Sequence, residues 1–365
     1  FSWNHCKIDG EENIEFRKEI AIENSFQKNF FSKKSWPLHW YFFLTVAILG
    51  AKLNPKKING SAKNWLISKF QPEEMLEVFW KPFIESTTNT DWNEASARIV
   101  TTILNECTKN FPDSVQIFHP KKNLSINAIN IIEEKLRSKG VKFLFGNSVT
   151  KINKEKTIVN NKGIEFDGFN EVVLALPTSA CQRIWINSSL ATTSESNRWK
   201  SQTTRGINTL WIVLPKNWTR VQKKNSKNYW EIRQLSRSHD QSFFVVVERP
   251  NCSNRFVISV VQSAVDNTHK RQKKNIEKIK IAANDYLGWM FDLSLSDCEY
   301  KLIFEKKATF ASFHTLSDNQ KLWGNFETGI SGIWRCSDDC ICDYPATIES
   351  AVKAGKLLAK KIVSR

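Results

Sequence analysis

The spacing of apolar residues predicts helices in the first part of the chain. Apolar side chains recur at helical spacing over 67–87 and over 95–108. A third helical pattern runs from 124 to 136 and is followed by Gly140, a residue that commonly ends helices. We therefore expect packed α structure before residue 140.

The pattern then changes to short apolar or β-branched runs. We expect strands over 141–145, 148–153, 157–159 and 171–176. The sequence Asn-Asn-Lys-Gly at 160–163 is typical of a turn, and Pro177 ends the last of these strands. This region is predicted to form a short β meander followed by a buried strand.

A second block of strands follows a polar stretch. Residues 181–205 are rich in Ser and Thr, and we expect them to cross between domains. Strands of a mostly antiparallel sheet are predicted over 207–214, 229–235, 242–248, 255–262 and 300–305. Residues 276–291 have the pattern of a helix lying against that sheet.

The last helix has the clearest pattern in the chain. Pro345 stands where a helix start accepts proline. An apolar stripe at helical spacing follows, formed by Ile348, Ala351, Val352, Gly355, Ala359 and Ile362. We expect this stripe to face the core.

The most apolar run, Trp36 to Gly50, has two interpretations. Its 15 residues fall short of the roughly 20 that a helix needs to span a bilayer. It is either a buried helix or a helix lying in a membrane interface. In the second case the aromatic residues would lie at headgroup level between basic residues: Trp36, Trp40 and Tyr41, flanked by Lys33, Lys34 and Lys52.

Composition places the chain among folded proteins. With 365 residues, 41% hydrophobic and 25% charged, it has room for two domains, and a disordered tail, a collagen-like rod or a pure coiled coil is excluded. The net charge of +16 attracts anions, whether nucleic acid, a phospholipid surface or a phosphate-bearing cofactor. No arginine-rich stripe, zinc-finger spacing or RNA-binding aromatic motif is present, so no nucleic-acid partner is expected. A basic nucleic-acid-binding protein remains an alternative that rests on charge alone.

The eight cysteines indicate reduced thiols and a cytoplasmic location. Cys336, Cys340 and Cys342 are close together, but no second Cys or His pair follows at zinc-like spacing. We expect no metal site.

The loop before the last helix holds residues suited to an anionic ligand. A helix N-terminus presents unpaired N–H groups and a partial positive charge, and Ala346 and Thr347 stand at this one. An acidic residue upstream, Asp338, could hold a sugar-like hydroxyl. From the residues alone, Asp338 and Asp339 could equally complete the loop and favour the helix start.

These residues resemble the C-terminal flavin motif of the FAD-dependent amine oxidase and phytoene desaturase superfamily. The usual form is L-A-G-D-W, a short loop, then P-A-T-x-E-x-A-V-x-S-G. Here Asp338 is followed by Tyr344-Pro345-Ala346-Thr347-Ile348-Glu349-Ser350-Ala351-Val352. The resemblance implies that Asp338 faces the ribityl or phosphate region of FAD, with Ala346 and Thr347 near the flavin.

Further segments narrow the resemblance. Phe79-Trp80-Lys81-Pro82 with Asn89-Thr90, and Glu305 to Phe310, are similar to segments of the squalene-associated FAD-dependent desaturases, the hydroxysqualene dehydroxylases. Val149 to Ile152 resembles the adenine-side strand of the family, and Val172 to Pro177 resembles its V-V-x-A-x-P strand. By this match Val149 would contact the adenine, Ala175 and Pro177 would line the cofactor, and Trp80, Pro82 and Asn89 would shape an isoprenoid tunnel.

The resemblance implies an α/β fold of the amine oxidase type with two discontinuous domains. The FAD-binding domain, a glutathione reductase-type dinucleotide-binding fold without its first βαβ unit, would comprise 116–180 and 305–365. An α+β substrate domain would comprise 31–115 and 181–304, and the role of the polar segment 1–30 is open. The implied activity is reduction of an isoprenoid lipid by reduced FAD, in this branch conversion of hydroxysqualene to squalene at the cytoplasmic membrane face. No catalytic acid is identified.

The sequence lacks glycines that the family has at two places. No G-x-G-x-x-G is present, although this motif lets the backbone approach a pyrophosphate. Ser337 stands where the family has glycine, and Asp339 would add negative charge beside the pyrophosphate. Three explanations stay open: an enzyme whose N-terminal segment lies outside this sequence, a protein completed by a second chain, or a degenerate homologue that binds no FAD.

Overall fold

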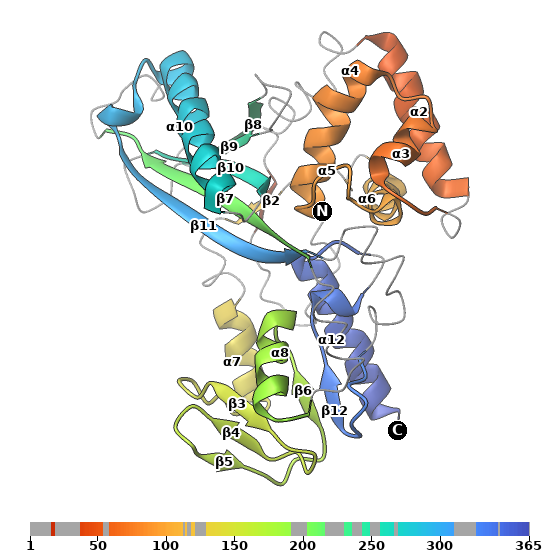
Figure 1. Cartoon of the computed structure of the whole chain (residues 1–365), viewed down its shortest axis with the longest axis vertical. Coiled ribbons are helices and arrows are strands. Elements are labelled where there is room, and N and C mark those ends of the chain that lie inside the picture. The colour runs from red at the N-terminus through yellow and green to blue at the C-terminus, as the bar shows by residue number, and fades with distance from the viewer. Residues whose placement is uncertain are drawn as a thin grey trace.

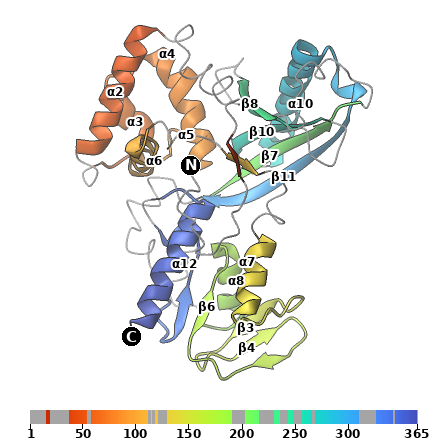
Figure 2. The ribbon, with the colours of Figure 1, turned by 180° about the vertical axis from the view of Figure 1, so that it is seen from behind.

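The computed structural model divides into three parts (Figures 1 and 2). A helical unit and an antiparallel sheet lie at one end, and a smaller α/β unit that contains the C-terminal helix lies at the other. The structure describes residues 16–18, 37–53, 58–111, 114, 118–120, 129–190, 203–215, 230–235, 243–248, 256–265, 269–309, 326–341 and 344–364. Trp36, Lys33, Lys34, Cys342, and the predicted segments 124–128 and 191–202 lie outside these residues.

The helical unit is built from six short elements around a shared apolar core. They are α2 (Leu38–Leu53), α3 (Ala62–Ile67), α4 (Glu73–Met75), the π-helical turn η3 (Leu76–Trp80), α5 (Lys81–Thr88) and α6 (Ala97–Lys109). Large side chains from most of these elements are buried in it, including Trp40, Trp65, Met75, Phe79, Trp80, Ile84 and Trp92. The helix expected over 95–108 is confirmed as α6.

The single helix expected over 67–87 is wrong at its start. Instead, α3 ends at Ile67, and Phe70 has a φ of 57°, which no right-handed helix allows. Pro72 then serves as the N-cap of α4, and the helical path continues through η3 into α5. Apolar spacing did not reveal this break, because it falls between two segments that both pack into the same core.

The five-stranded sheet has the order β11-β7-β10-β9-β8, with every neighbouring pair antiparallel. Its strands are β7 (Thr203–Val213), β8 (Trp230–Leu235), β9 (Phe243–Glu248), β10 (Val257–Val265) and β11 (Glu299–Thr309). One face is covered by α10 (His269–Phe291), whose Ile279, Ala283 and Leu287 pack with Leu210 and Val260. The predicted antiparallel sheet and its covering helix are confirmed.

The α/β unit contains a parallel strand pair and a small meander. Its strands β6 (Val172–Leu174) and β12 (Ile333–Arg335) run parallel, and the meander consists of β3 (Val149–Ile152), β4 (Ile158–Asn160) and β5 (Glu165–Phe166). Its helices are α7 (Asn130–Ser138), α8 (Thr178–Asn187), the 3-10 turn η8 (Asp338–Cys340) and α12 (Ile348–Val363). The predicted turn at 160–163 is confirmed, with Gly163 at a φ of 76°.

One sequence expectation in this unit is wrong. Residues 141–145 form no strand, because the segment folds back on α7: Val141 N donates to Leu136 O at 3.0 Å, and the Arg137 guanidinium lies 4.8 Å from the Phe143 ring. The first residues of the expected crossing 181–205 lie in α8, where Cys181 and Trp185 are buried.

The face that α12 buries also differs from the prediction. Its buried residues are Ser350, Ala354 and Leu358, whereas Ile348 of the predicted stripe is 49% exposed. The buried side packs against η8, where the chain approaches closely and small residues fit. The apolar stripe read from the sequence therefore lies mainly on the outer side of α12.

Two more features are placed by the structure. Strand β1 (Phe16–Lys18), in the polar N-terminal segment, pairs antiparallel with β2 (Phe118–Pro120). In the described part of the chain, no helix is both long enough and apolar enough to cross a bilayer.

Candidate functional site

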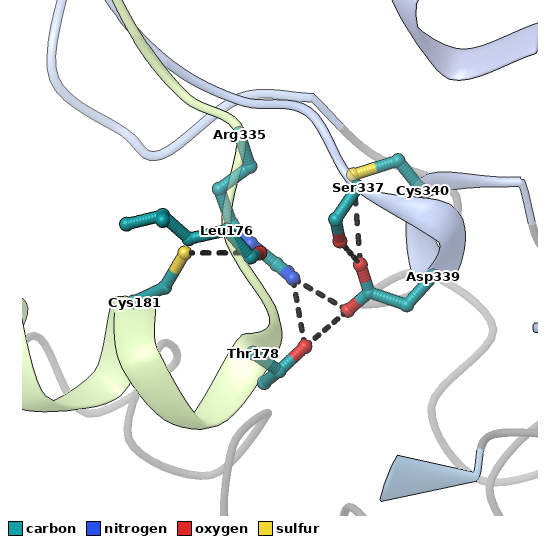
Figure 3. A network of polar contacts seen from close by, with 7 residues as sticks. All are labelled: Leu176, Thr178, Cys181, Arg335, Ser337, Asp339 and Cys340. Atoms are coloured by element: carbon teal, nitrogen blue, oxygen red, sulfur yellow. Dashed lines mark hydrogen bonds and ion pairs between the residues drawn. The ribbon is translucent and has the colours of Figure 1, made fainter. Parts of the chain in front are cut away.

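The carboxyl ends of β6 and β12 lie side by side and form the candidate site (Figure 3). Leu174 pairs with Arg335, and Cys336 N donates to Leu174 O at 3.1 Å. The segments that follow the two strands therefore leave the same sheet edge. In open α/β sheets this edge is where ligands bind. The structure thus brings the segments that contain Ala175, Pro177 and Asp338 to one sheet edge.

A buried polar network occupies the centre of this site (Figure 3). Arg335 Nη2 donates to Asp339 Oδ2 at 2.5 Å and to Thr178 Oγ1 at 3.0 Å, and the Thr178 hydroxyl donates to the same carboxylate oxygen. Ser337 donates to Asp339 Oδ1. The side chains of Arg335 and Asp339 are only 1% and 2% exposed. The network joins the end of β12 to the first turn of α8.

The charges in this network stabilise each other. Burial alone would raise the pKa of Asp339, but the Arg335 guanidinium and the hydrogen bonds from Ser337 and Thr178 hold it below its ordinary value. Burial opposes the charge of Arg335 as well, yet the Asp339 carboxylate holds the pKa of Arg335 above its usual range. Both groups are therefore ionised at neutral pH.

The network also accounts for the two departures from the family motif. Ser337 has φ −145° and ψ 178°, an extended backbone that needs no glycine, and its hydroxyl points to Asp339. The charge of Asp339 is offset by Arg335 rather than left unpaired beside a ligand. With Ser337 and Asp339 in place of the family residues, β6 and β12 still end side by side at one sheet edge.

Arg335 has unused hydrogen-bonding capacity. Its Nε and Nη1 groups are buried and have no hydrogen-bond partner. Buried donors are normally paired, and leaving one unpaired costs about 1–3 kcal/mol.

The N-terminus of α12 is the second component of the site. Thr347 caps the helix by accepting from Ser350 N at 3.3 Å, and Ser350 Oγ accepts from Thr347 N at 3.0 Å. The preceding Ala346 packs against Ile99 and Ile103 of α6. This contact fixes the positive end of the α12 dipole at the junction with the helical unit.

Tyr344 adds a further link between α12 and α6. Burial and the hydrogen bond with Glu106 raise the pKa of its phenol, and the Lys353 ammonium lies 3.5 Å from its ring centroid. The phenol therefore stays protonated and acts as a donor to the Glu106 carboxylate.

Val149 lies on the meander, at the first position of β3. It packs against the apolar cluster formed by β6, α8 and β12, which includes Val172, Leu174 and Trp185. The main chain of β3 is tied to α8, because Ile152 N donates to Ser188 Oγ at 2.8 Å. Val149 therefore belongs to the same unit as Ala175 and Asp338.

The three predicted tunnel residues lie in the helical unit. Trp80 is fully buried and its indole Nε1 donates to Gln71 Oε1 at 2.9 Å, and Pro82 is buried at the start of α5. Asn89, with φ 48°, accepts from Ala264 N at 2.8 Å through its side chain. Trp80 and Pro82 are core residues here, whereas Asn89 joins α5 to the sheet.

Sequence reasoning missed several of these groups. Arg335 had a usable signal, since it is a charged residue at the end of the apolar strand Ile333-Trp334 and lies four residues before Asp339. Thr178 gave none. Glu85 gave none either, although burial, opposed by Lys81, raises its pKa to about 7.

In the part of the chain that the structure describes, the parallel pair of β6 and β12 has an unpaired edge at β6. Among the described residues, no strand pairs with the edge of β6 opposite β12, and Val173 is 41% exposed. Nearby apolar side chains of the same unit are also exposed, among them Ile132, Leu136, Leu144 and Phe145. Parallel strands normally lie in larger sheets with both faces covered. This edge fits a further parallel strand.

Among the described residues, no group of three or more His, Cys, Asp or Glu side chains could hold a metal ion. The thiols of Cys336 and Cys340 lie at the strand end and in η8.

Comparison with known proteins gives the fold. Neither a protein family model nor a curated protein sequence matches the chain. Among solved structures, a double mutant of putrescine oxidase with redesigned cofactor binding is 13% identical, with a TM-score of 0.64 over 90% of this chain and 77% of that one. An oxidoreductase from Methanosarcina mazei is 13% identical, with a TM-score of 0.61 over 89% and 73%. Reduced UDP-galactopyranose mutase is 11% identical, with a TM-score of 0.50 over 86% and 70%.

These matches confirm the predicted fold class. The chain has the α/β fold of the amine oxidase-like flavoenzymes over about nine-tenths of its length. At such low identity they show the fold alone.

Proposed function

We propose that this chain is an FAD-dependent oxidoreductase of the amine oxidase type that acts on an isoprenoid lipid. The observation that carries the proposal is the meeting of Ala175, Pro177 and Asp338 at the carboxyl ends of two parallel strands in a fold of this class. The substrate we propose is hydroxysqualene and the product squalene, on the resemblance of the segments around Trp80 and Glu305 to the squalene-associated enzymes.

The described residues fit FAD in part. The Asp338 carboxylate would accept a hydrogen bond from a ribityl hydroxyl, and Ala175 and Pro177 would line the cofactor. The N-terminus of α12 would place its positive end near the flavin. The unpaired Nε and Nη1 of Arg335 would suit an oxygen-rich part of the ligand.

The pyrophosphate is the part of FAD that these residues do not fit. No G-x-G-x-x-G stands in the sequence to bring backbone N–H groups close to it. We propose that a strand and glycine-rich turn from polypeptide outside this sequence complete the sheet at the open edge of β6. The exposed Val173 and the unpaired strand edge support this placement.

When bound in its reduced form, FADH2, the cofactor would supply a hydride to the substrate carbon and a proton to the departing hydroxyl, which would leave as water. The protein contributes position and exclusion of water. Trp80 and Pro82 would support a substrate tunnel from behind, since both are buried in the helical core. Asn89 would fix the helical unit against the sheet through its hydrogen bond to Ala264.

A non-catalytic homologue is the second candidate. The observation in its favour is the same missing glycine motif, which leaves the dinucleotide site incomplete. It would keep the fold and the Arg335–Asp339 network but bind no flavin.

Flavin binding separates the two candidates. The chain, and the same chain extended by any residues encoded upstream, would be saturated with FAD, desalted and measured for flavin absorbance. Asp338→Ala is expected to weaken FAD retention at least tenfold, and Asp167→Ala, on an exposed loop of the meander, serves as the matched control. A folded extended chain that retains no flavin would favour the non-catalytic homologue.

The substrate requires its own assay. The flavin-loaded protein would be reduced and incubated with hydroxysqualene, and the products separated by mass. Squalene formation that depends on the reductant is expected. If flavin binds and no squalene forms, the fold assignment stands and the substrate proposal fails.

A further inference from the structure

Helix α2 is apolar on two opposite faces. One face, with Trp40, Ala47 and Ala51, is buried against the helical unit, and Asn105 of α6 donates to Ala51 O at 3.3 Å. The other face is exposed and bears four large apolar side chains: Leu38 (88% exposed), Phe42 (65%), Leu49 (51%) and Leu53 (75%). We call these four residues the α2 stripe.

The α2 stripe runs along one side of the helix, with the exposed Thr45 between Phe42 and Leu49. Its members follow at intervals of four, seven and four residues, which places them on one side of an α-helix over about 22 Å. Phe42 is held by an edge-to-face contact with Phe43 at 5.5 Å between ring centroids. An outer helix face in water is normally polar, and a helix that is apolar all round is normally buried or in contact with lipid.

The loop after α3 extends this surface. Ile67 is 50% exposed and Phe70 is 80% exposed. The loop lies beside α2, because Gln71 Nε2 donates to Phe43 O at 2.8 Å and the Lys69 side chain reaches Gly50. The apolar surface thus spans two segments that are held together by hydrogen bonding.

Lysines flank this surface, and two exposed acidic residues, Glu73 and Glu74, follow the loop at the start of α4. The described residues 37–53 and 58–72 contain three lysines, Lys52, Lys63 and Lys69, and no Asp or Glu. Exposed apolar side chains flanked by lysine are what an interfacial helix presents to anionic lipid.

We infer that the α2 stripe, with Ile67 and Phe70, docks this protein on the surface of a lipid bilayer that contains anionic headgroups. Leu38, Phe42, Leu49 and Leu53 enter the interface without crossing the bilayer, and Lys52 and Lys69 face the headgroups. The inference deepens the proposed function, because an isoprenoid substrate resides in the bilayer. It does not require flavin to be bound.

The test is flotation with vesicles of phosphatidylcholine alone and of phosphatidylcholine mixed with phosphatidylserine. The unaltered chain is expected to float with the mixed vesicles and more weakly with the neutral ones. Phe42→Ser/Leu49→Ser is expected to lower the bound fraction at least about tenfold, since two large apolar side chains no longer leave water. Ile281→Ser, which alters a 61% exposed residue of α10, is the matched control and should float like the unaltered chain.

Three results bear on the inference. Equal recovery of the unaltered chain and of Phe42→Ser/Leu49→Ser, with both folded by circular dichroism, would overturn it. A vesicle-independent dimer that the same double variant dissociates would overturn it as well and assign the stripe to a second copy. Lipid binding with no flavin retention would support the docking surface while the proposed function fails.

Discussion

Removing the Asp339 carboxylate tests the central network most severely. Asp339→Ala would leave the Arg335 guanidinium charged, 1% exposed and without its counter-ion. Breaking a buried ion pair from one side costs about 3–5 kcal/mol, because an uncompensated charge remains in a low-dielectric site. We expect the free energy of unfolding to fall by that amount, measured by urea denaturation followed by tryptophan fluorescence.

The matched variants separate charge from packing. Arg335→Leu/Asp339→Ala removes both charges, so we expect it to be more stable than Asp339→Ala alone. The reasoning would be refuted if Asp339→Ala cost less than about 1 kcal/mol, or if the effects of the two single variants simply added.

Acid provides an independent check on Asp339. Because its pKa is held below the unfolded value of about 3.9, its contribution to stability is present above that pH and is lost as the pH falls through the lower folded pKa. The unaltered chain should therefore lose stability in this acidic range more steeply than Arg335→Leu/Asp339→Ala.

Three other substitutions test individual positions. The native protein loses stability as the pH rises through about 7, because the buried Glu85, whose pKa is raised to about 7, becomes charged. Glu85→Gln should therefore raise the free energy of unfolding at about pH 8, by about 1–2 kcal/mol in urea melts, and leave it nearly unchanged at about pH 4, where Glu85 is uncharged. Gln71→Leu should cost about 1–3 kcal/mol in the same melts because the buried Trp80 indole N–H loses its acceptor, and an unchanged midpoint would contradict this. Gly332→Ala should lower the thermal midpoint, by an amount equivalent to about 1–3 kcal/mol, because Gly332 has φ 75° and a Cβ would lie 3.1 Å from Asn170 O. Equal melting of the two proteins would refute that account.

Much of the fold was predictable because its apolar pattern is local. The alternating runs of β7 and β10 pair directly in the sheet, and the period of α6 matches its buried face. The apolar spacing did not show the break at Phe70, because α3 and α4 pack into one core, but Pro72 was a signal for it, since the residue before a proline disfavours helical backbone. The buried face of α12 was misjudged for a related reason, as the close approach of η8 selects Ser350 and Ala354 over larger apolar residues.

The sequence indicated which segments form the candidate site but not which side chains pair within it. The motif placed Asp338 at the strand end, and the structure adds that its neighbour Asp339 points into a network with Thr178, which lies 161 residues away in the sequence. A contact over that separation leaves no trace in spacing or composition. Ser337 and Asp339 depart from the family motif, and the structure explains both: Asp339 pairs with Arg335, and Ser337 donates a hydrogen bond to Asp339.

Retention of FAD by the folded protein tests the central claim most directly. The chain extended by any residues encoded upstream would be saturated with FAD, desalted, and measured for flavin absorbance per polypeptide. We predict close to equimolar flavin, with at least tenfold weaker retention in Asp338→Ala and no change in Asp167→Ala. A folded extended chain that retains no flavin would contradict the account.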